Sequence, residues 1–232
     1  MAEPMTPAQL QRALLGEHLA VKAPRGWENH ERDDETGKPF GPVHGVIVHH
    51  TASHDSFKVI WNGYGGLPGP LAHAYIDKAG VVWLTSAGRA NHAGLGDRDV
   101  FNAVKAESYA TRPPVPNERN ADGNDCFYGF ECENLGDGKD PWPRVQLVAM
   151  VKATAAICRF YGWTAKSVIG HKEWTNQKVD PRGIDMPKFR ADVAACLKAK
   201  PGVWTGGVAA KPDAEMTVDQ RLDRIEKYLG LA

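Results

Sequence analysis

Two short apolar segments that each lead into a histidine place the strongest constraint on the fold of this chain. Residues 46–48 are β-branched and precede His49, and residues 168–170 precede His171. Runs of this length and composition are typical of buried strands. A histidine at a strand end lies at the edge of a sheet, where α/β proteins often form their sites. The histidines are far apart in the sequence, so no local metal-binding signature joins them.

Other periodic segments mix strands with helices along the chain. Residues 73–76 and 81–84 are apolar runs on either side of a turn that contains Gly80, which predicts a β-hairpin. Residues 147–158 carry apolar side chains at helical spacing, and so do residues 189–197. Because strands and helices intermingle, the sequence predicts an α/β or mixed-sheet domain.

We predict three parts, which are a main domain over residues 1–200, a linker over 201–214 and a short C-terminal helix over 215–232. The main domain opens with a helix, since Thr6 and Gln9 have the spacing of a capping box. The linker is rich in Gly, Ala and Pro, as flexible connections are. Thr217 and Gln220 form a second capping box before a helical apolar pattern of about two heptads, which is too short to predict a coiled coil.

The charge balance argues against two classes of partner. The chain has 28 basic and 28 acidic residues, so it lacks the basic excess of a nucleic-acid-binding protein. No stretch approaches the roughly 20 apolar residues that a membrane span requires, and we expect no membrane insertion. The first residues lack the basic and apolar regions of a secretory signal peptide. We therefore expect a protein made in soluble form in the cytoplasm.

The four cysteines match neither a zinc ribbon nor a CxxC redox site. They are Cys126, Cys132, Cys158 and Cys196. We expect reduced thiols in the core. A disulfide between Cys126 and Cys132 is the alternative if the protein acts outside the cell.

His49, His171 and Asp180 form the candidate metal site. Asp180 lies nine residues after His171 and directly before a proline. Two imidazoles and one carboxylate suit Zn²⁺, with water in the fourth position, and three protein ligands are typical of a catalytic rather than a structural site. Spacing alone leaves the alternative open that each histidine is a hydrogen-bonded core residue.

Five stretches together carry a family resemblance. They are GVIVHHTAS, LAHAYIDKAGVVW, RANHAG, YGFECENLG and VIGHKEWTNQKVDPRG, in this order over about residues 45 to 195. The sequence resembles the peptidoglycan amidase family, which includes type-2 N-acetylmuramoyl-L-alanine amidases, phage endolysins and animal peptidoglycan recognition proteins. This resemblance implies a mixed central β-sheet flanked by helices.

The resemblance also implies roles for single residues. His49, His171 and Asp180 correspond to the zinc ligands, the third of which is Cys in some members and Asp in others. Lys178 corresponds to a lysine that stabilises the oxyanion. Glu131 corresponds to the general base of some members.

Two further histidines fall in the matched stretches. His92 belongs to RANHAG, where relatives line the substrate groove, and we assign it with His73 to substrate binding. Packing is the alternative for His73. Several phage members have a catalytic tyrosine just before the position of His73, but this chain has Ala72 there. The departure favours Glu131 as the proton-transfer residue. We expect the polar stretch at 95–126 to be a long loop that forms a wall of the groove with Arg98, Asn102 and Arg112.

The predicted activity is therefore zinc-dependent hydrolysis of the amide bond between muramic acid and L-alanine in peptidoglycan. With no signal peptide and a compact domain, the chain resembles a phage endolysin, which accumulates in the host cytoplasm and acts on the wall after membrane permeabilisation. Three alternatives stay open. They are a cytosolic amidase that recycles muropeptides, a non-catalytic peptidoglycan-binding module and a zinc hydrolase of another amide.

Overall fold

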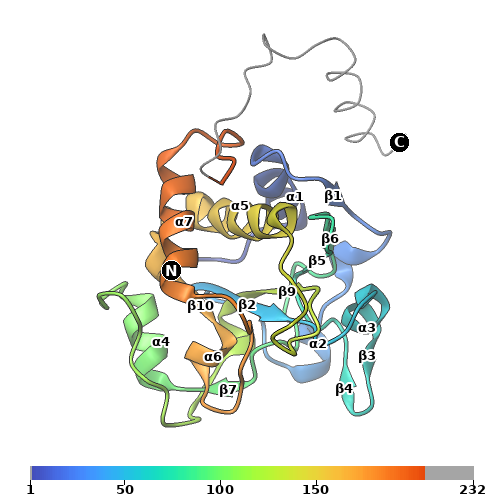
Figure 1. Cartoon of the computed structure of the whole chain (residues 1–232). Helices are drawn as coiled ribbons and strands as arrows, with labels where there is room; N and C mark the ends of the chain where they lie inside the picture. The colour runs from blue at the N-terminus through green and yellow to red at the C-terminus, as the bar shows by residue number, and fades with distance from the viewer. Residues whose placement is uncertain (1, 207–232) are drawn as a thin grey trace.

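A six-stranded mixed sheet forms the centre of the computed structural model, which describes residues 2–206 (Figure 1). From one edge to the other the strands are β1 (Val21–Lys22), β6 (Val82–Leu84), β5 (Ala74–Ile76), β9 (Phe127–Cys132), β2 (Gly45–His50) and β10 (Val168–Gly170). All neighbours pair in parallel except β5 and β6, which are the antiparallel hairpin that the sequence predicted. The mixed-sheet fold is thus confirmed.

Helices and small hairpins cover the two faces of this sheet (Figure 1). One face carries α1 (Pro7–Gly16), α5 (Arg144–Tyr161) and α7 (Met186–Lys198). The other side carries α3 (Phe57–Asn62), α4 (Arg98–Lys105), α6 (His171–Trp174) and the hairpins β3–β4 (Gly63–Tyr64, Leu67–Pro68) and β7–β8 (Leu95–Gly96, Ala121–Asp122). Short elements complete the described chain, namely α2 (Asp33–Thr36), η1 (Trp27–Asn29), η2 (Gly123–Asp125) and η3 (Ala165–Ser167).

Successive residues of β2 enter two different cores. Val46 and Val48 belong to the large apolar cluster that includes α5 and α7, whereas Ile47 belongs to a second cluster with Phe127 and Trp174. A strand buried on both faces reads as a continuous apolar run, which explains the sequence pattern. Because side chains alternate along a strand, His49 lies on the same face as Ile47. The strand therefore directs His49 away from α5.

The polar stretch at 95–126 is not the uninterrupted loop that we predicted. It contains β7, α4, β8 and η2. Asp97 caps α4 by accepting hydrogen bonds from the backbone of Asp99 and Val100. Val100 and Val104 then pack into the second cluster. A helix of this length has only two turns of apolar pattern, which the surrounding prolines and polar residues obscured.

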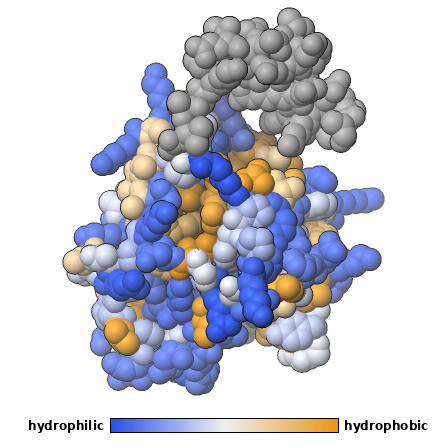
Figure 2. Space-filling view, in the orientation of Figure 1, coloured by the Kyte–Doolittle hydropathy of each residue, from blue (hydrophilic) through white to orange (hydrophobic). Residues whose placement is uncertain are grey.

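All four cysteines are buried and free, in agreement with the predicted reduced thiols. None of the described helices is long and apolar enough to cross a membrane. The face shown in Figure 2 is mostly hydrophilic, and apolar residues show only in limited areas.

The first residues after α7 lie against the main domain. The backbone NH of Gly202 donates to Glu17 Oε2 at 2.9 Å, and Arg144 donates to the carbonyl of Gly206. The start of the predicted linker is thus attached to α1 and α5. The rest of the linker and the predicted helix at 215–232 lie outside the described residues, so the division into three parts stays a prediction.

Leu14 and Leu15 offer a matched test of how firmly α1 belongs to the domain. Leu14 is fully buried where α1 packs on α5, whereas Leu15 is 41% exposed. We expect Leu14→Ala to lower the free energy of unfolding by about 2–5 kcal/mol. Leu15→Ala should change it by less than about 0.5 kcal/mol. Urea denaturation measures both, and equal effects would contradict the packing of α1.

Candidate metal centre and substrate groove

Strand pairing brings the sequence-predicted metal ligands to one place. His49 lies in β2, and His171 follows β10, which pairs with β2 in parallel. Asp180 comes from the next loop, whose path is fixed where the Lys172 backbone NH donates to the Asp180 carbonyl at 2.8 Å. Glu131 is the register partner of His49 on β9. These residues therefore meet at the carboxyl ends of the parallel strands.

The three ligand atoms form a tight triangle. His49 Nδ1 lies 2.9 Å from His171 Nδ1 and 3.0 Å from Asp180 Oδ2, and His171 Nδ1 lies 3.1 Å from the same oxygen. All three residues are buried. Among the described residues, these three side chains form the one group of His, Cys, Asp or Glu whose geometry could hold a metal ion.

Hydrogen bonds on the far side of each ring fix which nitrogen carries the proton. His171 Nε2 lies 3.1 Å from the Ala93 carbonyl, so Nε2 donates and Nδ1 keeps its lone pair. His92 Nε2 likewise donates to the Phe127 carbonyl at 2.9 Å, so His92 Nδ1 is an acceptor. It accepts from His49 Nε2 at 3.0 Å. With both rings neutral, the two Nδ1 lone pairs therefore point at each other and at a carboxylate, an arrangement that suits a cation between them.

A zinc ion fits this donor set. Ligands on tetrahedral zinc, with bonds of about 2.0–2.1 Å, lie about 3.3 Å apart. The observed triangle is only slightly tighter. Two neutral imidazoles and one carboxylate leave a fourth position for water or substrate, as in catalytic zinc sites.

The pKa values keep the ligands ready for metal at neutral pH. Burial and the neighbouring His171 lower the pKa of His49 to about 4. Burial opposes the ionised form of Asp180, but the adjoining imidazoles of His171 and His49 outweigh it and hold the pKa of this carboxyl far below its usual range. Metal ligands bind in their deprotonated forms, which both residues adopt here.

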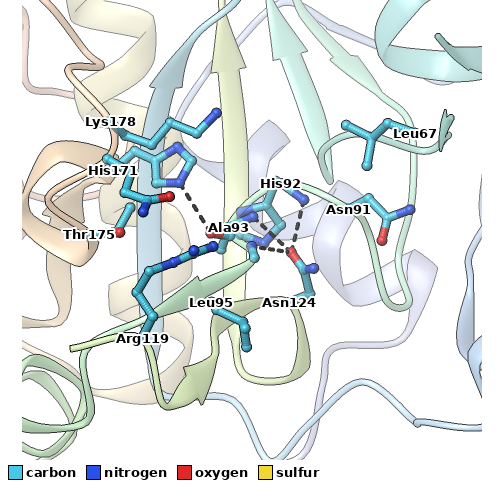
Figure 3. A pocket seen from close by; sticks show the side chains of 12 residues that line it. Leu67, Asn91, His92, Ala93, Leu95, Arg119, Asn124, His171, Thr175 and Lys178 are labelled. Carbon is cyan, nitrogen blue, oxygen red and sulfur yellow. Dashed lines mark hydrogen bonds between the residues drawn. The ribbon is translucent and has the colours of Figure 1, made fainter. Parts of the chain in front are cut away.

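One turn, residues 92–94, supports both imidazoles. Its three backbone NH groups donate to Asn124 Oδ1 at 2.8–3.1 Å. Figure 3 shows these bonds together with the bond from His171 to Ala93. Asn124 lies outside every motif that the sequence analysis named. Its role was not evident from the sequence because its partners are 30 to 32 residues away.

The structure places the two predicted substrate-binding histidines differently. His92 is bonded to His49 and also lines the groove described below. Gly129 makes room for its ring, since a Cβ there would lie 2.4 Å from His92 Cγ. His73 is fully buried, accepts a hydrogen bond from the Gly129 backbone NH, and packs against Phe40. This position gives no support to substrate binding by His73 and fits the packing alternative.

Two adjoining cavities form a groove over the metal site. The metal cavity, of about 340 Å³, is lined by Asp180 and Glu131 among others. The basic cavity, of about 190 Å³, is lined by Arg119 and Asn124 among others. Both share Leu67, Asn91, His92, His171, Gln177 and Lys178. Exposed apolar side chains stand along the groove, namely Tyr64, Leu67, Leu95 and Val179.

Glu131 reaches the metal cavity as an unpaired carboxyl. Its Oε2 is buried and has no hydrogen-bond partner among the described residues. Burial, reinforced by the charge of Asp180, raises the pKa of Glu131 well above its usual value, and Lys178 opposes this shift. Perturbed carboxyls of this kind are typical of catalytic sites. The side chain of Lys178 points into the open groove in Figure 3.

Two further predictions near the site concern the missing catalytic tyrosine at position 72 and the 95–126 stretch. Ala72 is fully buried, and Tyr75 donates its hydroxyl to Glu133 at 2.7 Å rather than facing the metal site. The 95–126 stretch does form a wall of the groove, but through Leu95 and Arg119. The predicted wall residues Arg98, Asn102 and Arg112 line neither cavity. Tyr64, which belongs to the β3–β4 hairpin, lines the metal cavity. Sequence reasoning missed both Arg119 and Tyr64, since neither lies in a recognisable motif.

A family model described as N-acetylmuramoyl-L-alanine amidase matches residues 39–183. This range holds His49, His171 and Asp180 and spans more than half of the chain. The chain belongs to this family. The protein is thus a hydrolase, and the buried group of His49, His171 and Asp180 is its zinc site. No curated protein matches the sequence.

Several solved structures resemble the fold. LysC, an N-acetylmuramoyl-L-alanine amidase from Clostridium intestinale URNW, is 16% identical, covers 65% of this chain and 85% of its own, and has a TM-score of 0.45. The Ph2119 endolysin from Thermus scotoductus MAT2119 bacteriophage Ph2119 is 16% identical, with 75% and 98% covered and a TM-score of 0.46. AMPDH3 from Pseudomonas aeruginosa is 22% identical, with 83% and 70% covered and a TM-score of 0.46. These likenesses concern the fold alone.

Loss of the His92 acceptor should weaken the zinc site of this amidase. We expect His92→Leu to reduce zinc affinity by about 10–100-fold, because His49 then lacks the partner that fixes its proton on Nε2. His92→Asn should retain part of the affinity, since its side-chain oxygen can accept the same hydrogen bond. Competition with a fluorescent zinc chelator measures both. Parent-like affinity in His92→Leu would contradict the role of His92 in orienting His49.

Proposed function

We propose that this amidase hydrolyses the bond between the lactyl group of N-acetylmuramic acid and L-alanine in peptidoglycan. The observation that carries the proposal is the convergence of two Nδ1 lone pairs and one carboxylate at the floor of a groove, within the range that matches the family model. His49, His171 and Asp180 hold the zinc ion. When bound, zinc polarises the amide carbonyl and activates water.

Glu131 serves as the proton carrier in this proposal. It faces the metal cavity beside Asp180 with a buried oxygen that lacks a partner. A carboxyl whose pKa is raised by burial can take a proton from the attacking water and pass it to the leaving amine of L-alanine. No other described carboxyl lines the metal cavity apart from the ligand Asp180.

Lys178 stabilises the developing charge. It lines both cavities next to His171, and its charge acts on Glu131 and His49. An ammonium group at this position favours the oxyanion that forms when the carbonyl carbon becomes tetrahedral. The same charge also favours the ionised form of Glu131, which must accept a proton first.

The wall polymer, rather than a small soluble fragment, is the proposed substrate, as for a phage endolysin. The groove continues on two sides of the shared residues His92, His171 and Lys178, toward Arg119 and toward Val59. An extended groove suits a strand that passes through the site. A muropeptide-recycling amidase is the second candidate, because it needs the same catalytic residues. A non-catalytic binding module is disfavoured, since Asp180 retains a ligand oxygen.

Purified, zinc-loaded protein should release stem peptides with new L-alanine amino termini from isolated cell walls. Mass spectrometry of the products measures this, and new reducing sugar ends would instead indicate a glycosidase. His171→Ala and Asp180→Ala should abolish both release and zinc binding. Hydrolysis by these variants at the parent rate would refute the zinc-amidase proposal. Faster turnover of intact walls than of soluble muropeptides supports the endolysin, and the reverse supports recycling.

Glu131→Gln separates proton transfer from metal binding. The amide keeps the shape of the side chain but accepts no proton, so we expect kcat to fall by about 10²–10⁴-fold. Zinc affinity should stay close to that of the parent, because Glu131 is not among the three ligands. Steady-state kinetics and zinc titration test the two statements. A kcat within twofold of the parent would exclude Glu131 as the base.

A further inference from the structure

The basic cavity has positive charge without any acidic counterpart. Arg119 and Lys178 both line it, and its other lining residues include no Asp or Glu. Figure 3 shows both side chains among those that line the cavity, with His171 between them. The metal cavity differs, because Glu131 and Asp180 contribute acidic groups there. The groove is therefore electrostatically asymmetric across the metal site.

The backbone on both sides of Arg119 is fixed. The NH groups of Asn117 and Glu118 donate to Asp97 Oδ2 at 2.7 and 2.9 Å, and Asp97 itself is buried. The NH of Asn120 donates to the Gly96 carbonyl at 3.0 Å. Arg119 thus projects from a held segment rather than from a loose loop, which lowers the entropy cost of binding through it.

The guanidinium of Arg119 is not used within the protein. Among residues 2–206 it forms no hydrogen bond or ion pair, whereas the nearby Arg98 donates to the Asn120 carbonyl at 2.8 Å. The acidic neighbour Glu118 accepts a hydrogen bond from the Asn120 side chain instead. A guanidinium with all donors available is suited to bidentate recognition of a carboxylate.

We propose that the basic cavity binds the free α-carboxylate of the second stem-peptide residue, a γ-linked D-glutamate, through Arg119. This inference rests on the proposed function and adds a direction to it. The sugars of the glycan strand are neutral, and the muramic acid carboxyl is part of the scissile amide. The first free carboxylate therefore belongs to the peptide, at its second residue. The peptide then extends toward Arg119, and the glycan lies in the metal cavity along Val59, Ile60 and Leu71.

Two substrates that differ in one group test this inference. They are disaccharide peptides of identical sequence whose second residue is either γ-linked D-glutamate or its α-carboxamide. We expect the parent protein to cleave the acid with a kcat/KM about tenfold above that of the amide, since a charge-assisted hydrogen bond is lost in the amide. Arg119→Gln should remove this preference by raising KM for the acid, with kcat nearly unchanged.

Arg112→Gln is the matched control. Arg112 is an exposed arginine of the same stretch that lines neither cavity, so its loss changes the net charge equally and should leave the preference intact. Equal cleavage of acid and amide by the parent would overturn the carboxylate site while leaving the proposed function standing. An Arg119→Gln variant that is slower on both substrates alike would also overturn it. Cleavage of neither substrate by the parent would refute the proposed function itself, together with this inference.

Discussion

The rest of the site depends on the hydrogen bonds that the two metal-site imidazoles donate to the turn at residues 92–94. His92 accepts from His49, and the Ala93 carbonyl accepts from His171. Each bond fixes a proton on the outer nitrogen and thereby presents the inner lone pair to the metal. Asn124 holds the whole turn through three backbone bonds. The Asn124 side chain therefore helps to orient both imidazoles by holding the turn that accepts their hydrogen bonds.

The sheet supplies the rigid frame for this arrangement. Parallel pairing places β2 between β9 and β10, so residues from three distant segments reach the same edge. Alternation along β2 then turns His49 toward the face that carries α6 and away from α5. Since both faces of the strand are buried, a shift of register would bury His49 in the wrong core. The apolar packing and the metal site thus constrain each other.

Charge divides the groove into two functional parts. The carboxyls of Glu131 and Asp180 lie on one side, where burial raises the pKa of Glu131 and the adjoining imidazoles lower that of Asp180. Lys178 lies between the two cavities, and Arg119 extends the positive charge beyond it. Catalysis and substrate orientation are therefore proposed for adjacent groups that differ in burial. In this proposal the buried groups carry out proton transfer and metal binding, Lys178 stabilises the oxyanion, and Arg119 selects the substrate.

The sequence alone determined the strands that lead to His49 and His171, the helices at 147–158 and 189–197 and, through the ordered motifs, the three metal ligands. These features depend on local periodicity or on contiguous motifs, which can be recognised in the sequence without knowing the fold. Only the tertiary structure decided the contacts of Asn124, the place of Arg119 in the groove and the burial of His73. The partners of Asn124, of His73 and of the backbone segment that carries Arg119 lie tens of residues away and are set by strand register and by one turn. Polar residues with such distant partners have no periodic signal, because their function arises only when the chain has folded.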